Sequence, residues 1–465
     1  MPQAFYVLFG AVFTASTALA LGKLLLRQLG LKFHRVEEHV FAFATGAACL
    51  SLLVFLLTAA QLARKGVFLA LGLLVIGMAI RRGAHRPLGE SFPPLPRLWR
   101  ILFGAIFVFF TVVYFANAMA PEMSPDGSSY HLGLVARYMR ERGFTRITTN
   151  MYANLSQGVE MLFLYAFAFG RHSAAALVHF SFLFTLPLAM LAYAKRFGFP
   201  KAGAAAALLF YLSPVVGIDG ISAYIDVATA CVLFCLFYLL QIWDSERNPA
   251  LLVPIGLLAG FGYAAKYTAF VAVPYAVVFV GWKLLRARRP CRKPMLVIVC
   301  CALLMMVPWI AKNWIILGNP VSPFFNRLFP NPYVHVSFEK EYAQAMRNYP
   351  GLKSRWDIPL EVTLRGNVLH GLLGPVFLLA PIGLLALREP QARQLLLAAA
   401  VFGSTYFANI GTRFLIPSLP YIALLMAMAM ARWRVVMPVL VVAQALASWP
   451  PNIKKYSDDR AWRLV

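Results

Sequence analysis

The sequence predicts an all-α membrane protein, a polytopic bundle of about 13–15 transmembrane helices with two long loops on its outer face. Three observations support this prediction. The chain has 465 residues, of which 60% are hydrophobic and only 13% are charged, whereas soluble domains carry about 25% charged residues. Apolar runs of about 20 residues, enough to cross a bilayer, recur along the chain. Its 30 Pro and 31 Gly are spread through an apolar chain, as membrane helices tolerate.

The apolar runs give the predicted order of the helices. They cover residues 4–22, 38–62, 66–81, 101–119, 174–194, 202–218, 222–243, 250–265, 268–286, 294–316, 368–387, 394–409, 413–431 and 434–449. The first run lacks a basic leader and a small-residue cleavage pattern, so we expect a retained helix. Residues 157–171 form a shorter run, which we interpret as a shallow or re-entrant helix. A crossing there would move the basic run 283–293 to the outer face.

Charge predicts the orientation of the bundle. The chain carries 43 Lys and Arg against 18 Asp and Glu, a net charge of +25. In a soluble protein this excess would suggest nucleic-acid binding. Here the basic residues lie between apolar runs, where they fix topology and meet anionic lipids, so we expect membrane lipids and no nucleic acid as partners. The clusters fall on one face, which should be cytoplasmic, at residues 23–35, 81–100, 195–201, 283–293, 388–393 and 432–434. Arg64 with Lys65 and the tail 454–463 are exceptions.

Composition also suggests a division of the chain. A Pro-rich hinge at residues 83–97 separates three leading helices, residues 1–97, from a core at 98–465. The core holds both outer loops, about 120–156 and 317–367. The six Cys lie mostly inside apolar runs. We therefore expect them to act as small apolar residues, and we expect neither a disulfide framework nor a zinc site. Polar residues at a membrane boundary are costly and usually functional, which directs attention to the outer loops.

The first outer loop contains a candidate catalytic carboxylate. Pro125 and Gly127 flank Asp126, as in a turn. The spacing of apolar residues over 128–142 predicts an amphipathic helix lying in the membrane interface. Asp126 then stands at the start of this helix, either as a turn or N-cap residue or as a general base near an acceptor hydroxyl. His131 is either its partner or an interfacial polar residue.

Asp226 is a second candidate carboxylate. It opens a strongly apolar run at the outer end of the predicted helix 222–243. An ionisable residue near membrane depth is usually functional. The alternatives are a helix cap or one member of a buried ion pair.

Four short motifs follow one another at the predicted outer face. They are Pro125-Asp-Gly-Ser-Ser-Tyr-His-Leu; Asn154-Leu-Ser-Gln-Gly-Val-Glu-Met-Leu; Ser222-Ala-Tyr-Ile-Asp-Val-Ala with Ala265-Lys-Tyr-Thr-Ala; and Gly318-Asn-Pro-Val-Ser-Pro-Phe with Thr412-Arg-Phe-Leu-Ile-Pro-Ser-Leu-Pro. Their order over residues 120–420 resembles the type C (GT-C) glycosyltransferases. The likeness is greatest to the branch of protein mannosyltransferases and lipid A aminoarabinose transferases.

The resemblance implies an inverting glycosyltransferase of the cell envelope. It would move a sugar from a polyprenyl-phosphate donor to a lipid, glycan or protein acceptor, at the outward face of a bacterial inner membrane. It implies Asp126, with Asp226, as the catalytic carboxylates. Positioned cations would stabilise the charge of the leaving phosphate, although each could instead be an interfacial anchor. The implied phosphate ligands are Lys266, Arg365 and Arg413, and the other implied substrate contacts are Tyr130, His131 and Tyr224.

The sequence departs from the family pattern in ways that limit these implications. The first loop has no acidic doublet, so no cofactor is certain and a divalent metal is not indicated. Gln157-Gly158 stands where the family has Lys-Pro-Pro, which removes one phosphate ligand. Three predicted helices precede the matching core.

Two other classes of function share these features. A lipid-linked glycan polymerase or ligase also combines a lipid carrier with outer-loop arginines, but takes a diphosphate-linked glycan. A transporter or flippase would show paired broken helices and charge at the membrane midplane. The second outer loop interleaves aromatic and charged residues, either as a cover over a substrate groove or as an interfacial belt. Clustering of Asp126, Asp226, Lys266 and Arg413 in space would favour an enzyme.

Overall fold

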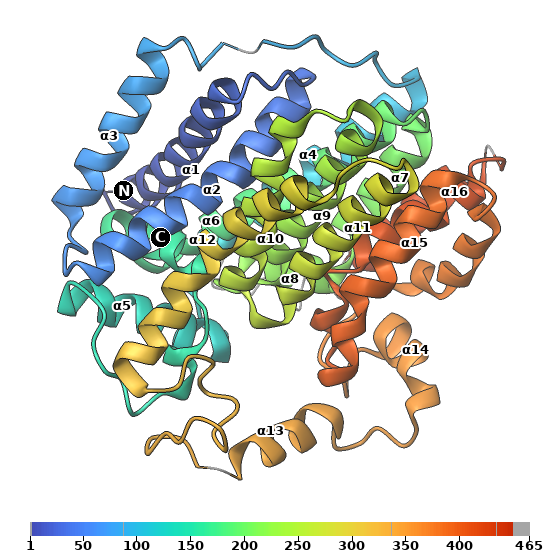
Figure 1. The fold of residues 1–465 in the computed structure, drawn as a ribbon. Coiled ribbons are helices and arrows are strands. Elements are labelled where there is room, and N and C mark those ends of the chain that lie inside the picture. Colours follow the sequence, from blue (N-terminus) through green and yellow to red (C-terminus); the bar gives the residue numbers. More distant parts are fainter. Residues whose placement is uncertain (1, 87, 336, 434, 450–465) are drawn as a thin grey trace.

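A computed structural model describes residues 2–86, 88–335, 337–433 and 435–449, and Figure 1 shows them as a single body of packed helices. Within these residues every regular element is a helix and no strand occurs. The predicted all-α class is therefore confirmed. The basic tail 454–463 and the first residue of the predicted helix 434–449 lie outside the described residues.

The α-helices differ widely in length. The long helices are α1 (Pro2–Gln28), α2 (Arg35–Ala59), α3 (Lys65–Arg81), α4 (Arg97–Ala118), α6 (Gly158–Arg196), α9 (Asp226–Glu246), α11 (Ala272–Arg286) and α12 (Arg292–Leu317). The shorter α-helices are α5 (Leu132–Glu141), α7 (Pro200–Tyr211), α8 (Pro214–Ile221), α10 (Leu252–Ala265), α13 (Phe338–Arg347), α14 (Ile358–Leu360), α15 (Pro390–Gly403), α16 (Leu419–Met430) and α17 (Val436–Ser448). The 3-10 and π turns used below are η1 (Gly127–His131), η4 (Tyr267–Val271), η6 (Glu361–Arg365), η7 (Pro375–Ala386) and η9 (Thr412–Leu415).

Helix length and composition make the chain a polytopic membrane protein. Among the described residues, seven helices are long and apolar enough to cross a membrane, and α7 with α8, bent by 65°, forms an eighth candidate. This is fewer than the predicted 13–15. The other predicted spans correspond to shorter helices, including the apolar helices Pro249–Ala265, Pro375–Ala386, Leu419–Met430 and Val436–Ser448.

Glycine allows the leading helices to pack tightly. A Cβ atom on Gly22 of α1 would lie 1.7 Å from the carbonyl oxygen of Ala42, and one on Gly46 of α2 would lie 1.7 Å from that of Ala18. Small residues that let two backbones approach are typical of membrane helix contacts. Gly170 of α6 likewise lies against the backbone of Tyr6 in α1. The leading helices thus pack directly on the core.

The short apolar segment 157–171 forms the first part of α6, which breaks at Arg171 (φ 57°, ψ −142°). At its start, the Gly158 carbonyl accepts a 2.7 Å hydrogen bond from Ser51, inside α2. After the break the helix continues to Arg196, whose guanidinium pairs with Glu37 at the start of α2, at 2.6 Å. The first part of α6 therefore does not extend to the end of the bundle that holds Arg196, which is consistent with a re-entrant helix.

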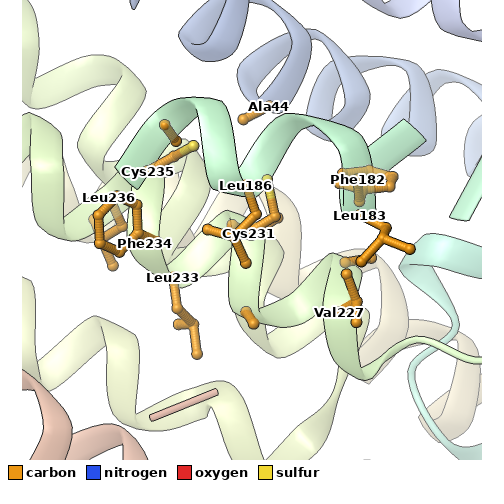
Figure 2. Close-up of a cluster of buried hydrophobic side chains, with 14 of the residues drawn as sticks. Ala44, Phe182, Leu183, Leu186, Val227, Cys231, Leu233, Phe234, Cys235 and Leu236 are labelled. Atoms are coloured by element: carbon orange, nitrogen blue, oxygen red, sulfur yellow. The ribbon is translucent and has the colours of Figure 1, made fainter. Parts of the chain in front are cut away.

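Helix α9 forms the buried centre of the bundle. In Figure 2, Val227 and Cys231 of α9 lie beside Leu183 and Leu186 of α6 within a cluster of apolar side chains. Cys231 is fully buried, and all six cysteines are free. The cysteines thus serve as small apolar residues.

The bundle has two chemically different ends. The connection from α3 to α4 crosses the top of Figure 1, whereas α5 and α13 lie at the bottom. Helix α9 joins the two, since it begins at Asp226 and ends beside the Lys283–Asp244 and Arg196–Glu246 ion pairs. At 1.5 Å per residue it spans about 30 Å, the thickness of a bilayer's hydrocarbon core. Asp226 thus lies about one membrane thickness from the basic end.

Candidate active site

An ion pair joins the first outer loop to a segment far along the chain. Nη2 of Arg413, in η9, lies 2.5 Å from Oδ2 of Asp126. Asp126 immediately precedes η1, yet its side chain makes no capping hydrogen bond. The two side chains are 26% and 32% exposed, so solutes can reach both. The N-cap alternative for Asp126 is therefore excluded, because its carboxylate points to Arg413.

A second ion pair lies beside the first. Lys266, where the chain extends between α10 and η4, donates to the buried carboxylate of Asp226. The Lys266 ammonium lies 4.4 Å from the centre of the Phe414 ring, and the Arg413 guanidinium lies 5.0 Å from the same centre. Burial opposes the charge of Arg413, but the carboxylates of Asp226 and Asp126 raise its pKa above the ordinary value. Four predicted site residues thus form one cluster.

Two cavities meet at this cluster. One, of about 570 Å³, is lined by Asp126, Asp219 and Tyr224 among others. The other, of about 360 Å³, is lined by Tyr130, His131, Asp226, Lys266 and Arg347 among others. Both are lined by Met346, Asn409, Arg413 and Phe414. We call the first the acidic cavity and the second the cationic cavity. The two therefore share a wall that contains Arg413.

The cationic cavity has a polar inner end. Nδ1 of His131 lies 2.7 Å from Oε1 of Glu160, and both side chains are buried. The other carboxylate oxygen of Glu160 and the amide nitrogen of Gln157 have no hydrogen-bond partner in the described structure. Nearby, the buried Lys312 donates to the carbonyl oxygen of Ala153 at 2.7 Å. The buried inner end of the cationic cavity therefore contains hydrogen-bonding groups without a partner among the described residues.

Aromatic side chains line both cavities. The ring of Tyr130 stacks on Tyr152 at 4.5 Å. Burial, followed by the negative charge of Asp126, raises the pKa of both phenols above the ordinary value. They therefore stay protonated and can donate hydrogen bonds. Tyr224 lies in the acidic cavity, with the Arg413 guanidinium 5.0 Å from its ring centre.

Arg365 is the one predicted site residue that stands apart. Its side chain is exposed and lines neither cavity. The site prediction also left out charged residues that line the two cavities, among them Asp219, Glu160, Glu339 and Arg347. Asp219 is 1% exposed; one of its oxygens accepts the Val227 N–H at 2.8 Å, while the other has no hydrogen-bond partner among the described residues. Asp219 and Glu160 are charges within apolar runs, the signal that singled out Asp226.

The acidic residues do not form a metal-binding set. Within the part of the chain that the structure describes, no three His, Cys, Asp or Glu side chains are close enough together to hold a metal ion. Asp126 and Asp226 are each paired with a cationic side chain instead. The cationic side chains at this position can bind an anion.

Residues 5–350 match the family described as Domain of unknown function (DUF8201). The chain belongs to this family. No curated protein matches the sequence. The family match spans α1 to α13 and so includes the leading helices, Asp126, Asp226 and Lys266, whereas Arg413 lies beyond it.

Two solved structures are similar in fold. One is ArnT from Cupriavidus metallidurans bound to undecaprenyl phosphate, with a TM-score of 0.49 and 17% identity, covering 73% of this chain and 61% of that chain. The other is the same protein in the apo state, with a TM-score of 0.48 and 16% identity, covering 72% and 60%. ArnT is a type C lipid A aminoarabinose transferase. This chain spans about three fifths of its length, and the likeness describes the fold alone.

Proposed function

We propose that the chain is an inverting membrane glycosyltransferase. It moves a sugar from a polyprenyl-phosphate carrier to an acceptor hydroxyl at the end of the bundle opposite the basic clusters, on the outer face of the membrane. The observation that carries the proposal is the position of Arg413. It pairs with the carboxylate of Asp126 and lies in the wall shared by the acidic and cationic cavities.

The cationic cavity suits the donor. Lys266, Arg347 and Arg413 place cations on its walls, which also hold the carboxylates of Glu160, Asp226 and Glu339. Positioned cations stabilise a leaving phosphate. The buried pair of His131 and Glu160 supplies hydrogen-bonding groups for sugar hydroxyls. Tyr130 and Tyr152 can donate to phosphate or sugar oxygens. The donor phosphate would thus lie near Arg413 and the sugar farther inside.

The acidic cavity suits the acceptor. Asp126 accepts the proton of the acceptor hydroxyl, whose oxygen forms a bond to the anomeric carbon of the donor sugar. The bond from that carbon to the phosphate oxygen breaks, and its electron pair leaves with the phosphate beside Arg413 and Lys266. A single displacement of this kind inverts the anomeric centre. Asp226 is less suited to act as the base, because it is buried against Lys266.

The shared position of Arg413 also suggests an order of binding. In the structure, Arg413 engages Oδ2 of Asp126, so that oxygen is not free for an acceptor proton. A phosphate in the cationic cavity competes for the guanidinium. Donor binding would thereby release Asp126 toward the acceptor, so the base becomes available when the leaving group is in place.

The test is transfer by the purified full chain. Radiolabelled sugars on undecaprenyl phosphate, the lipid bound in one ArnT structure, are the first donors, and a membrane lipid extract supplies acceptors. We expect transfer by the native protein and loss of it in Asp126→Asn. Asp357→Asn is the matched control, because Asp357 lies in the same outer region but lines neither cavity. Full activity of Asp126→Asn would remove this residue from catalysis, and transfer only from diphosphate-linked donors would favour a polymerase or ligase.

A further inference from the structure

A groove lies on the outside of the bundle, between α1, α2 and the second part of α6. It has a volume of about 650 Å³ and shares no lining residue with the two active-site cavities. Its walls include Val12, Leu19, Val36, Phe43, Phe184 and Leu188. Val12 and Phe184 are 62% and 38% exposed. The groove is therefore open at the side of the helices that faces lipid.

Its walls are apolar although hydroxyl groups line them. Ser181 donates to the carbonyl oxygen of Leu177 at 3.0 Å, and Thr185 donates to that of Ser181 at 2.7 Å. Both hydroxyl protons are thus satisfied within α6. The walls therefore suit a hydrocarbon chain.

One end of the groove is positively charged. Arg35 and His39 of α2 line this end. Behind them, Nζ of Lys23 lies 3.3 Å from Nε2 of His39, and Lys23 is only 4% exposed. Arg35 is exposed, so its guanidinium carries the positive charge at this end.

The nearby carboxylates are paired with other cations. Glu37 pairs with Arg196, and Glu38 lies 3.7 Å from Arg27. Among the described residues, neither Lys23 nor Arg35 has a carboxylate oxygen within 4.0 Å. Among the described residues, the Arg35 guanidinium at the mouth of the groove therefore has no ion-pair partner, while Lys23 behind it still interacts with the charge of Glu38.

The dimensions match one leaflet of a bilayer. Arg35 and Phe43 are eight positions apart on α2, which corresponds to about 12 Å along the axis. Half of the hydrocarbon core is about 15 Å thick. Arg35 lies in the basic end of the bundle, so the charges stand at the headgroup level and the apolar walls extend toward the membrane centre.

We propose that this groove binds an anionic phospholipid from the leaflet at the basic end of the bundle. One acyl chain lies between α1 and α6, and the phosphate contacts the guanidinium of Arg35, with the Lys23–His39 pair behind it. A polyprenyl carrier fits less well, because its chain is several times longer than the groove. The leading helices then provide a lipid site on the face opposite the proposed transfer reaction.

Native mass spectrometry of the purified full chain tests this site. The protein is incubated with equal amounts of phosphatidylglycerol and phosphatidylcholine, and the retained lipids are counted. We expect the native chain to retain phosphatidylglycerol. Retention should fall about fivefold or more in Arg35→Glu, because one basic residue near an anionic lipid surface contributes about 1 kcal/mol to binding. Arg82→Glu is the control; Arg82 is also exposed at the basic end but lies outside the groove.

A second pair of variants tests the apolar wall without changing charge. Ala15→Phe fills the groove from α1 and should also lower retention, whereas Ala105→Phe, on the exposed side of α4, should not. Thermal unfolding of each variant separates lost binding from lost folding. Equal retention by Arg35→Glu and Arg82→Glu, or by Ala15→Phe and the native chain, would overturn the proposal, as would displacement of phosphatidylglycerol by undecaprenyl phosphate. Sugar transfer is not the readout, so the result is independent of the proposed function.

Discussion

The guanidinium of Arg413 contacts the carboxylate of Asp126, 287 positions earlier in the chain. This contact brings together the first outer loop and the segment after α15, which the bundle holds beside the start of α9. Because Arg413 also lies against the cationic cavity, it links the proposed base to the proposed leaving-group site. Changes at Arg413 should therefore affect chemistry more than donor affinity.

Replacing Arg413 by Ala should lower kcat about 100-fold or more, the usual effect of removing a group that stabilises developing charge. Arg413→Lys should retain part of the activity, since it keeps the charge but loses the planar donor geometry. Arg365→Ala is the control, because Arg365 is exposed and lines neither cavity; it should stay within about twofold of the native rate. The measurement is initial-rate transfer at saturating donor. Equal losses in Arg413→Ala and Arg365→Ala would contradict this assignment.

Asp226→Asn should destabilise the protein. The change leaves Lys266 without its buried partner, and breaking a buried pair costs up to about 3–5 kcal/mol. Because Lys266 is 19% exposed, we expect a smaller loss, about 1–3 kcal/mol. The control is Asp244→Asn; Asp244 is 22% exposed and pairs with Lys283 and Arg247, which are 26% and 30% exposed, and each such pair should contribute about 0–1 kcal/mol. Thermal unfolding in detergent compares the two variants, and a larger loss in Asp244→Asn would be the contrary result.

Glu160→Gln should weaken donor binding while largely preserving the maximal rate. The substitution keeps the size of the side chain but removes the charge that faces His131. If the sugar lies at this end of the cationic cavity, the donor KM should rise about tenfold, corresponding to one lost charge-assisted hydrogen bond. Glu341→Gln, an exposed change outside both cavities, provides the control. An unchanged donor KM in Glu160→Gln would remove the sugar from this end.

The helices and the main charges of the site could be predicted because both depend on local composition. Apolar runs long enough to cross a bilayer identify helices directly, and Asp226 and Lys266 stand out as charges at the ends of such runs. Asp126 stands out by its turn before a predicted amphipathic helix. The end of the predicted segment 157–171 coincides with the break at Arg171, whereas the 65° bend between α7 and α8 was not predicted. Arg171, His172 and Ser173 interrupt the apolar pattern in the sequence, whereas the predicted run 202–218 continues through the junction of α7 and α8.

The partners of the site residues were harder to predict than the residues themselves. Asp219 and Glu160 lie within apolar segments, and the sequence shows no partner for either charge. The fold places Asp219 at the acidic cavity and Glu160 beside His131. Arg365 and Arg413 look alike in sequence, as single arginines near apolar runs. Only the tertiary contacts distinguish the arginine that meets a carboxylate from the one that is exposed.

The crossing of α1 and α2 gives a prediction about stability that is independent of catalysis. Gly46→Ala places a methyl group 1.7 Å from a backbone oxygen of α1, so the helices must separate. Overpacking of this kind typically costs about 1–3 kcal/mol. Gly104→Ala is the matched control, because a Cβ at Gly104 of α4 meets no atom within 4 Å and Ala favours a helix over Gly by about 1 kcal/mol. Thermal unfolding should therefore show a lower Tm for Gly46→Ala and an unchanged or higher Tm for Gly104→Ala. A native Tm in Gly46→Ala would mean that the two helices are not closely packed at this crossing.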